Sequence, residues 1–322
     1  MNFWRGIDEK LQEETRNFWQ SKIGQDIINC EKGGHKQFQV CVRNNYFNVY
    51  WRGCSVLKYQ PNAIKHVHTI HHKYLKESGN NTYINLIHEN DDLVCSPDNK
   101  DLTCLEPRWR FRDKILAHAK KGEIPVVVKY AGEDIAEKKS LANYLERAKP
   151  CWLDLEIAFS REKEKDKVIK RTTVADRIDL AGIKMINGTP TLRFVEVKVV
   201  SDPRLRAIHD PEIFGQMIRY KKFIKEQTAI TGNKSGLLKS YKTLAQNMLD
   251  LGLIHNDIDL VRLFVQEGKI DDYPHLLIIG DKSDLEIGRH GNHWKKLCEW
   301  ANRYDFPEPT LFKDTCSNDN CL

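Results

Sequence analysis

The chain has 322 residues, which is enough to bury a large hydrophobic core and predicts two domains. Charged residues make up 30% of the sequence and hydrophobic residues 40%, a balance typical of a globular protein. The formal net charge of +6 at pH 7 is compatible with a polyanionic partner but does not require one, and no apolar run approaches the ~20 residues that cross a membrane.

The first residues, MNFWRGIDEKLQEETRNFW, are charged and amphipathic and contain no continuous apolar segment, so we expect no secretory signal. Nine cysteines are scattered along the chain. An odd and scattered set fits reduced thiols better than a disulfide framework, and this favours a cytoplasmic location.

Residues 1–128 are expected to form an N-terminal α+β domain. Apolar periodicity, helix-end signals and turn dipeptides predict its elements. In chain order these are a helix at 3–20, a hairpin at 37–59 that turns at Asn44-Asn45, a strand at 82–89, a helix at 106–122 and a strand at 124–130. No motif in this region indicates its role.

Residues 129–310 are expected to form a second domain, and residues 311–322 a flexible tail. The second domain is predicted to contain a helix at 133–149, strands at 152–160, 171–186 and 191–200, helices at 210–227 and 237–251, a strand at 274–281 and a helix at 291–304. Asn187-Gly188, between the second and third strands, is the strongest short signal for a hairpin. The order is therefore helix, three antiparallel strands, helix, then a later helix, strand and helix.

The strand TLRFVEVKVV, residues 191–200, carries two charged residues among β-branched and aromatic ones. Because successive side chains of a strand point to opposite faces, Glu196 and Lys198 share one face. A charged pair on a nearly buried strand is costly to desolvate unless something compensates it.

Hairpin geometry brings a second acid to the same face. A two-residue turn pairs Ile186 with Thr189 and sets Asp179 opposite Glu196, whereas a four-residue loop sets Asp179 opposite Lys198. Two carboxylates on one face repel each other unless a cation lies between them, and hard oxygen ligands suit Mg²⁺ or Mn²⁺. A lysine beside such an ion can stabilise charge on a phosphodiester or help to deprotonate the attacking water, so this arrangement can hydrolyse a phosphodiester.

Asp179 followed by Glu196-Val197-Lys198 on the next strand resembles the signature of the PD-(D/E)xK nuclease superfamily. Gln216 and Tyr220 in GQMIRY match the QxxxY motif of its RecB-like branch, and their spacing places them on one face of a helix. The resemblance covers about residues 135–285, and the proline of the nominal motif is absent because Asp179 follows ADRI.

The resemblance implies an α/β restriction-endonuclease-like core, in which a mixed central sheet is flanked by helices. It also implies that Asp179, Glu196 and the Val197 carbonyl bind the metal and that Lys198 is the catalytic lysine. Gln216 and Tyr220 would then approach the nucleic-acid backbone.

A further acid usually comes from the helix that precedes the three strands. Glu146 has that location but lies off the main apolar stripe of its helix. Glu156, on the strand at 152–160, is the alternative, and the sequence leaves the choice open.

Arg204 and Arg206 follow directly after the strand that carries Glu196 and Lys198. They are candidates to neutralise substrate phosphates, and solvated loop cations are the alternative interpretation. Other acid-x-lysine triplets begin at Asp8, Glu137 and Glu267, but each lies in a helical or loop-like context. The non-catalytic interpretation of the main motif is a surface-facing cross-strand pair of Asp179 with Lys198.

These observations predict a cytoplasmic, Mg²⁺- or Mn²⁺-dependent nuclease whose catalytic domain spans residues 129–310. DNA is the expected substrate because the family most often cuts DNA, and antiviral defence, restriction or repair is the expected setting. The alternative is a catalytically retired nuclease fold that binds nucleic acid or acts as a sensor. A third hypothesis is a nuclease controlled by a protein partner, a small ligand or self-association through residues 1–128.

Overall fold

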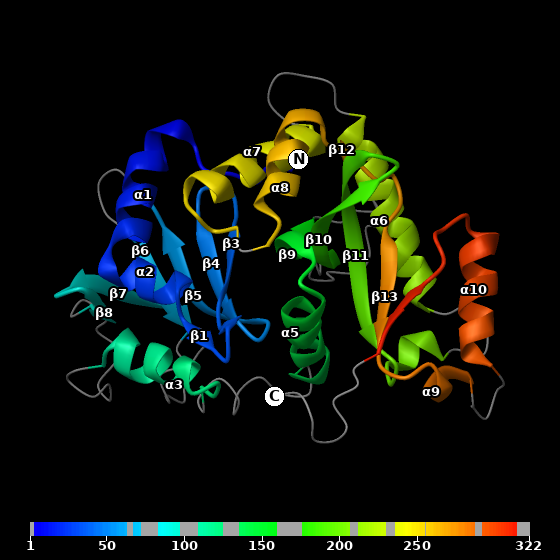
Figure 1. Cartoon of the computed structure of the whole chain (residues 1–322), viewed down its shortest axis with the longest axis horizontal. Helices are drawn as coiled ribbons and strands as arrows, with labels where there is room; N and C mark the ends of the chain where they lie inside the picture. The colour runs from blue at the N-terminus through cyan, green and yellow to red at the C-terminus, as the bar shows by residue number, and fades with distance from the viewer. Residues whose placement is uncertain are drawn as a thin grey trace, which may run out of the picture. The chain divides into compact units, whose positions relative to one another are not determined.

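The computed structural model describes residues 3–62, 67–71, 83–96, 109–124, 135–159, 176–206, 212–229, 236–254, 256–286 and 292–313. The chain forms two compact units. The first comprises Trp4–Lys149 and Gln246–His255, and the second comprises Met1–Phe3, Pro150–Ala245 and Asn256–Leu322. The boundary expected at residues 128 and 129 falls outside the described residues, and the main division lies after Lys149. Both units mix helices with strands, so the α/β class is confirmed (Figure 1).

An antiparallel sheet of six strands, which follow one another in chain order, forms the first unit. The strands are β3 Gln39–Val42, β4 Phe47–Trp51, β5 Cys54–Gln60, β6 Val67–His71, β7 Tyr83–Glu89 and β8 Asp92–Cys95. The turn predicted at Asn44-Asn45 joins β3 to β4. A second turn at Arg52-Gly53 divides the run that was expected as one strand, since both residues adopt positive φ angles of 46° and 75°.

Two helices near the N-terminus, α1 (Gln12–Gln20) and α2 (Lys22–Ile28), replace the single helix expected at 3–20. A short turn at Glu9–Leu11, η1, precedes them. The ring of Phe18 lies 4.1 Å from that of Tyr59 on β5, and Trp19 lies 5.3 Å from Phe47 on β4, measured between centroids. All four rings are buried, so aromatic packing holds α1 on the sheet.

Shorter elements complete the first unit. They are β1 Glu31–Lys32, β2 His35–Lys36, the π-helical segment η3 Arg112–Leu116, α3 Ala117–Lys120 and α5 Ile135–Ala148. Together η3 and α3 correspond to the helix predicted at 106–122, and α5 to the one predicted at 133–149. All but one residue of the strand expected at 124–130 lies outside the described residues.

A mixed sheet forms the second unit, in the order β14-β13-β11-β10-β9, with β12 also paired to β11. Its strands are β9 Cys151–Phe159, β10 Asp176–Ile186, β11 Thr189–Val199, β12 Lys269–Ile270, β13 His275–Ile279 and β14 Thr310–Phe312. The first three are antiparallel neighbours, whereas β13 runs parallel to β11. The last strand, β14, includes the first residues of the expected tail, and residues 314–322 lie outside the described part.

The hairpin between β10 and β11 has the two-residue turn, because Ile186 pairs with Thr189. Asn187 and Gly188 adopt φ angles of 48° and 76°, the left-handed conformations that such a turn requires and that this dipeptide accepts. The prediction of a tight hairpin at this position is therefore confirmed, and of the two loop lengths considered the shorter one forms.

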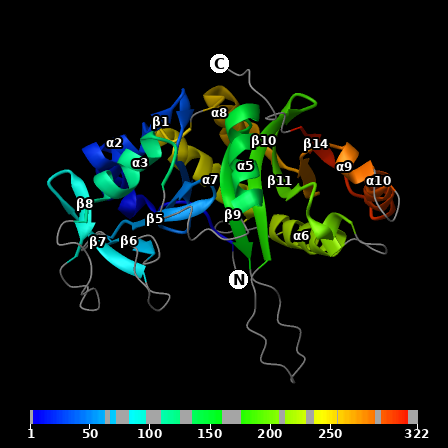
Figure 2. The ribbon, with the colours of Figure 1, turned by 90° about the horizontal axis from the view of Figure 1, so that it is seen from below.

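Helices cover the second sheet. They are α6 Glu212–Thr228, α7 Leu237–Asp250, α8 Ile258–Glu267, α9 Ser283–Glu286 and α10 His293–Arg303, with a short turn η4 at Pro203–Leu205. Only the first part of α7, up to Ala245, belongs to this unit. Phe223 of α6 stacks on Phe159 of β9 with ring centroids 4.2 Å apart. Tyr241 of α7 packs edge-to-face on Phe194 of β11 with ring centroids 5.4 Å apart. Figure 2 shows α6 beside β11, and this contact positions the candidate site.

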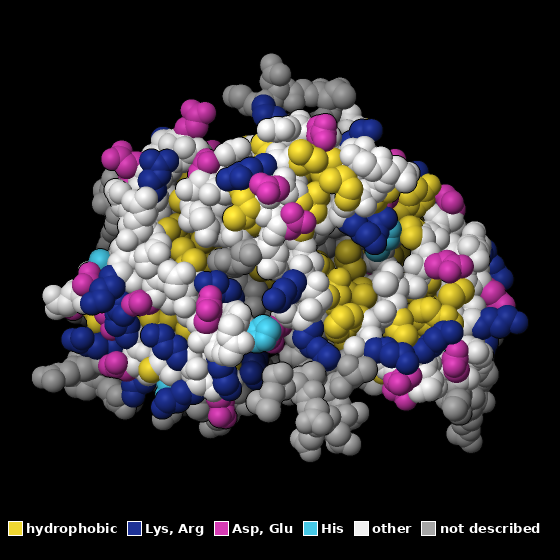
Figure 3. Space-filling model, viewed as in Figure 1, with side chains coloured by type: hydrophobic (Ala, Val, Ile, Leu, Met, Phe, Trp, Pro, Cys, Tyr) yellow, Lys and Arg dark blue, Asp and Glu magenta, His cyan; other side chains and the backbone are white. Residues whose placement is uncertain are grey.

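None of the helices that the structure describes combines the length and apolarity needed to cross a bilayer. Lys and Arg side chains are interspersed with Asp and Glu on the face shown in Figure 3 and do not gather into one patch.

Candidate active site

Strands β10 and β11 part where the acidic residues stand. Their backbone hydrogen-bond ladder ends at the pair Leu180 and Val195, and Asp179 directly precedes Leu180 on β10. Beyond this point β11 continues alongside β13. The Asp179 carboxylate accepts a hydrogen bond from the Val197 N–H at 2.7 Å, so a side chain takes over where the β10–β11 backbone ladder stops. Because the two strands separate here, the Asp179 side chain lies between them and faces Lys198.

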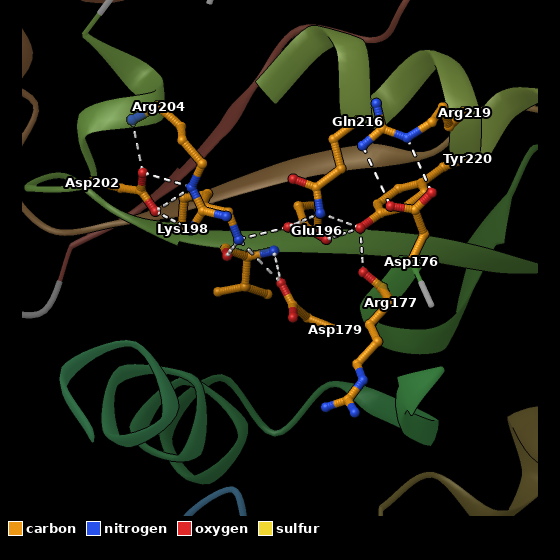
Figure 4. Close-up of polar contacts among 11 residues, drawn as sticks. Asp176, Arg177, Asp179, Glu196, Lys198, Asp202, Arg204, Gln216, Arg219 and Tyr220 are labelled. Atoms are coloured by element: carbon orange, nitrogen blue, oxygen red, sulfur yellow. Dashed lines mark hydrogen bonds and ion pairs between the residues drawn. The ribbon is translucent and has the colours of Figure 1, made fainter. Parts of the chain in front are cut away.

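Lys198 lies at the centre of the cluster, with only 2% of its side chain exposed. Its Nζ is 2.6 Å from Glu196 Oε1 and 3.6 Å from Asp179 Oδ2 (Figure 4). The same amine donates a hydrogen bond to the Val197 carbonyl at 2.7 Å. The three ionisable groups that the sequence places on one face therefore converge in the structure, and the surface-facing pair considered as an alternative is excluded because Lys198 is buried.

The Glu196 carboxylate is almost fully buried, and each of its two oxygens accepts a hydrogen bond from a side chain of α6. Gln216 Nε2 donates to its Oε1 at 2.9 Å, and the Tyr220 hydroxyl donates to its Oε2 at 3.1 Å. Burial, together with the negative charge of Asp179, raises the pKa of Glu196 well above its usual range, although Lys198 acts in the opposite direction. The folded protein therefore disfavours the charged form of Glu196, chiefly because the carboxylate is buried.

Side chains of α6 also bind the first residues of β10, which are no longer paired with β11. The one proton of the Tyr220 hydroxyl is shared between the Glu196 carboxylate and the Arg177 carbonyl, and Gln216 Nε2 donates to the hydroxyl oxygen. One turn away, Arg219 forks onto Asp176 with N–O distances of 3.0 and 3.3 Å. Gln216 and Tyr220 thus reach Glu196 and β10 in the structure, and their expected contact with a nucleic-acid backbone stays a prediction.

The two candidates for a further acid lie in different units. Glu156 is on β9, where the strand register sets it opposite Asp179, and its carboxylate is 3.4 Å from Arg177. Its φ of 52° is unusual for a strand residue that is not glycine. Glu146 is on α5 in the first unit and lies 3.5 Å from His35. Glu156 thus shares a unit with Asp179, and the choice between the two acids stays a prediction.

The arginines that follow β11 are both anchored to the protein. Arg204 forks onto Asp202, with Nη2 2.5 Å from Oδ2, and Arg206 donates to the Val200 carbonyl at 2.9 Å. Burial acts to raise the pKa of Asp202, but hydrogen bonds from Arg204 and the charge of Lys198 outweigh it, so that pKa is lowered. These arginines are therefore fixed in place rather than freely solvated, and Arg204 belongs to the charged surroundings of Lys198.

The donor set fits a hard divalent cation. The carboxylates of Asp179 and Glu196 and the Val197 carbonyl are all oxygen ligands, and a bound cation would stabilise the charged form of Glu196, which burial disfavours. Within the described ranges no group of three or more His, Cys, Asp or Glu side chains could hold a metal. Two carboxylates and a carbonyl are a lean set of the kind Mg²⁺ uses, because Mg²⁺ usually keeps several waters.

Several residues of the site carry no signal in the sequence. Asp176 precedes Asp179 by three residues, and Arg219 follows Gln216 by three, but either could equally be an ordinary surface charge. Asp202 sits in a loop, where it accepts a hydrogen bond from the Arg204 N–H. Only the helical spacing of Gln216 and Arg219 indicates a shared face, and no local pattern gives the partners of the other two.

Known proteins do not guide the assignment of this site. Comparison of the chain with protein-family models, with curated proteins and with solved structures finds no match in any of the three. No family is therefore assigned to the chain, and its function has to be inferred from the chemistry of the site.

Proposed function

We propose that the chain is a metal-dependent nuclease whose active site resembles that of the PD-(D/E)xK superfamily, on a restriction-endonuclease-like core. The supporting observation is the convergence of Asp179, Glu196 and Lys198 from two adjacent strands, with the lysine Nζ within 3.6 Å of both carboxylates. A mixed sheet with β11 at its centre and α6 against it fits this core.

Stability alone does not explain this cluster. Taking charges out of water is costly, and an apolar set of similar size in the same place usually gives equal or greater stability. Glu196 and Lys198 are 1% and 2% exposed, and the raised pKa of Glu196 shows that the folded protein disfavours its charge. Strongly perturbed ionisable groups cluster at functional sites, so the energetic cost points to chemistry.

Each residue then has a defined task. Asp179, Glu196 and the Val197 carbonyl would hold Mg²⁺ or Mn²⁺, and such an ion, when bound, supplies Lewis acidity and lowers the pKa of a coordinated water. Lys198 provides a positive charge at a fixed place, where it stabilises charge that develops on a phosphodiester. Gln216 and Tyr220 hold the Glu196 carboxylate in one orientation.

The proposed substrate is a nucleic acid, with DNA preferred because the resembling family most often cuts DNA. A role in defence, restriction or repair is proposed on the same ground. Glu156 is the proposed further acid, because its strand position brings it opposite Asp179.

A cleavage assay tests the proposal. Purified protein with Mg²⁺ or Mn²⁺ is expected to cut at least one member of a panel of single- and double-stranded DNA and RNA, and Asp179→Ala and Lys198→Ala are expected to abolish cutting. Lys184→Ala, an exposed lysine on the same hairpin, is the matched control and should cut like the parent. Equal cutting by the parent and Lys198→Ala would refute the proposal.

One observation favours a second candidate, a retired nuclease fold that binds nucleic acid or senses a ligand. The Lys198 amine donates to the Val197 carbonyl, the same oxygen that is expected to bind metal. Isothermal titration with Mn²⁺ separates the two: a retired site would show no Mn²⁺ binding that depends on Glu196.

A further inference from the structure

The acids of the proposed active site create an electrostatic problem for a polyanionic substrate. Asp179 and Glu196 stand beside Asp176 and Asp202, and Lys198 is the only lysine among the residues drawn in Figure 4. Phosphates that approach such a site are repelled unless further cations receive them. Figure 4 shows arginines on both sides of Lys198, with Arg204 on one side and Arg177 and Arg219 on the other.

Arg219 is fixed in an unusual way for an exposed arginine. Its Nε and Nη2 fork onto the buried Asp176 carboxylate at 3.0 and 3.3 Å, and its Nη1 donates to the Gly215 carbonyl at 3.0 Å. Nevertheless 45% of its side chain is exposed, against 5% for Asp176. A guanidinium that is already fixed by the protein on one edge and exposed to solvent on the other loses little conformational entropy when it binds a phosphate. Its planar, forked donors also match the geometry of phosphate oxygens.

Arg177 is placed by its backbone rather than by its side chain. Its carbonyl accepts from the Tyr220 hydroxyl, the same hydroxyl that holds Glu196. Its side chain is 64% exposed and is only loosely paired with Glu156, at 3.4 Å. The head group can therefore leave this pair for a phosphate at little cost, because exposed ion pairs are weak.

We propose that Arg177 and Arg219 on one side of Lys198, with Arg204 on the other, bind the phosphates that flank the scissile one. The inference rests on the proposed nuclease function and makes it more specific. The substrate class is a polynucleotide whose backbone spans the site, rather than a small molecule with one phosphodiester. Neither Arg177 nor Arg219 is part of the sequence motif.

The test compares cleavage of two substrates by two arginine variants and by one control variant. The variants are Arg177→Gln, and Arg219→Gln combined with Asp176→Asn so that the buried Asp176 carboxylate does not keep its charge after the guanidinium is removed. The matched control is Arg262→Gln with Asp259→Asn, an α8 pair at 3.1 Å whose arginine is 65% exposed. Cleavage of an oligonucleotide and of bis-(p-nitrophenyl) phosphate is measured with Mn²⁺, over a range of salt from about 50 to 200 mM.

Each variant is expected to lower kcat/KM on the oligonucleotide at least tenfold more than on the small diester, mainly through KM. The slope of log KM against log salt should fall by about 0.7–0.9 for each phosphate that the variant no longer neutralises. The control pair should change neither quantity. Equal losses on the two substrates, or an unchanged salt slope, would overturn the inference.

Failure of this inference and failure of the nuclease proposal give different results. If the parent cuts neither substrate, the nuclease proposal fails, and equilibrium binding of a fluorescent oligonucleotide then tests the arginines alone. The inference predicts at least tenfold weaker binding for both variants, and binding equal to the parent would overturn it. Thermal melting checks folding, and Arg177→Gln serves alone if the Asp176 double variant fails to fold, because its partner Glu156 is partly exposed.

Discussion

The two large sheets of this protein bury different kinds of residues at their centres. In the first unit, Phe47 and Tyr59 on β4 and β5 are fully buried against Phe18 and Trp19 of α1. In the second unit, the central strand β11 buries Glu196 and Lys198. Aromatic packing thus stabilises the centre of the first sheet, where the buried His68 also stacks on Tyr59, whereas the second sheet buries an acid-lysine cluster at the place where chemistry is proposed.

The contrast shows which buried cluster calls for an explanation beyond folding. A buried aromatic cluster needs no explanation beyond folding, because burial itself stabilises it. A buried acid-lysine cluster that the fold disfavours does need one. The following predictions test whether the two sheets differ in this way.

The largest effect on stability is expected in the first unit. Trp19→Ala removes a ring that is 1% exposed and leaves a cavity between α1 and the sheet, so the free energy of unfolding should fall by about 3–5 kcal/mol. Urea denaturation followed by circular dichroism measures it. Tyr83→Ala, on β7 of the same sheet but 60% exposed, is the control and should change stability by less than about 0.5 kcal/mol. A similar loss in both variants would show that burial does not organise this sheet.

The opposite result is expected at the centre of the second sheet. Replacing the buried pair together, by Glu196→Gln with Lys198→Met, should leave stability unchanged or raise it by roughly 1–4 kcal/mol in metal-free buffer. Lys198→Met alone should destabilise the protein, since it leaves the Glu196 charge buried without its cation. If the double variant is as unstable as the single one, the pair is structural and the contrast between the sheets disappears.

A smaller effect is expected where α6 holds Glu196. Tyr220→Phe removes hydrogen bonds to the Glu196 carboxylate and to the Arg177 carbonyl, at a cost of about 1.5–3 kcal/mol in stability for the bond to the charged group. Because the phenyl ring is kept, packing against Phe159 should persist. Looser positioning of Glu196 should also weaken Mn²⁺ binding, whereas a purely structural tyrosine would change stability alone. Calorimetric melting and Mn²⁺ titration read the two effects separately.

The smallest effect is expected for charges between β11 and the start of β13 in the second sheet. Asp271, just after β12, accepts from His275 at 2.9 Å and lies 3.3 Å from Arg193. Burial acts to raise its pKa, but the His275 hydrogen bond and charge outweigh it, so the pKa lies below its ordinary value of 3.8. A lowered pKa means that Asp271 stabilises the fold above pH 3.8 and that this contribution is lost as the pH falls through the folded-state pKa.

Asp271→Asn should therefore be less stable than the parent at neutral pH, by on the order of 1 kcal/mol, and the difference should shrink as the pH drops below 3.8. Urea denaturation at a series of pH values measures it. A difference that stays constant with pH would mean that the Asp271 carboxylate gains nothing from ionisation in the folded state.

The sequence predicts best what depends on neighbouring residues. Asn187-Gly188 gives the hairpin because these residues accept positive φ, and this turn alone sets the β10–β11 register that carries Asp179 toward Glu196. Helix α6 is predicted with Gln216 and Tyr220 on one face for a similar reason.

What the sequence does not predict depends on tertiary contacts. The parting of β10 from β11 at Leu180 has no local signal, and neither has the inward turn of Tyr220 onto Glu196. Glu146 and Glu156 are equally plausible from their positions in the sequence, and only the sheet register shows that Glu156 lies on the strand paired with that of Asp179. The turn at Arg52-Gly53 is a different case, because that dipeptide lies in an alternating run that reads as one continuous strand.

The proposed function depends most on a divalent cation binding between Asp179 and Glu196. Titration of Mn²⁺ into the metal-free protein, followed by isothermal calorimetry, tests this directly, with Glu196→Gln as the matched variant and Lys184→Ala as the control. The account predicts saturable binding to the parent and to Lys184→Ala that Glu196→Gln abolishes. Equal binding to the parent and to Glu196→Gln, or none to the parent, would contradict it.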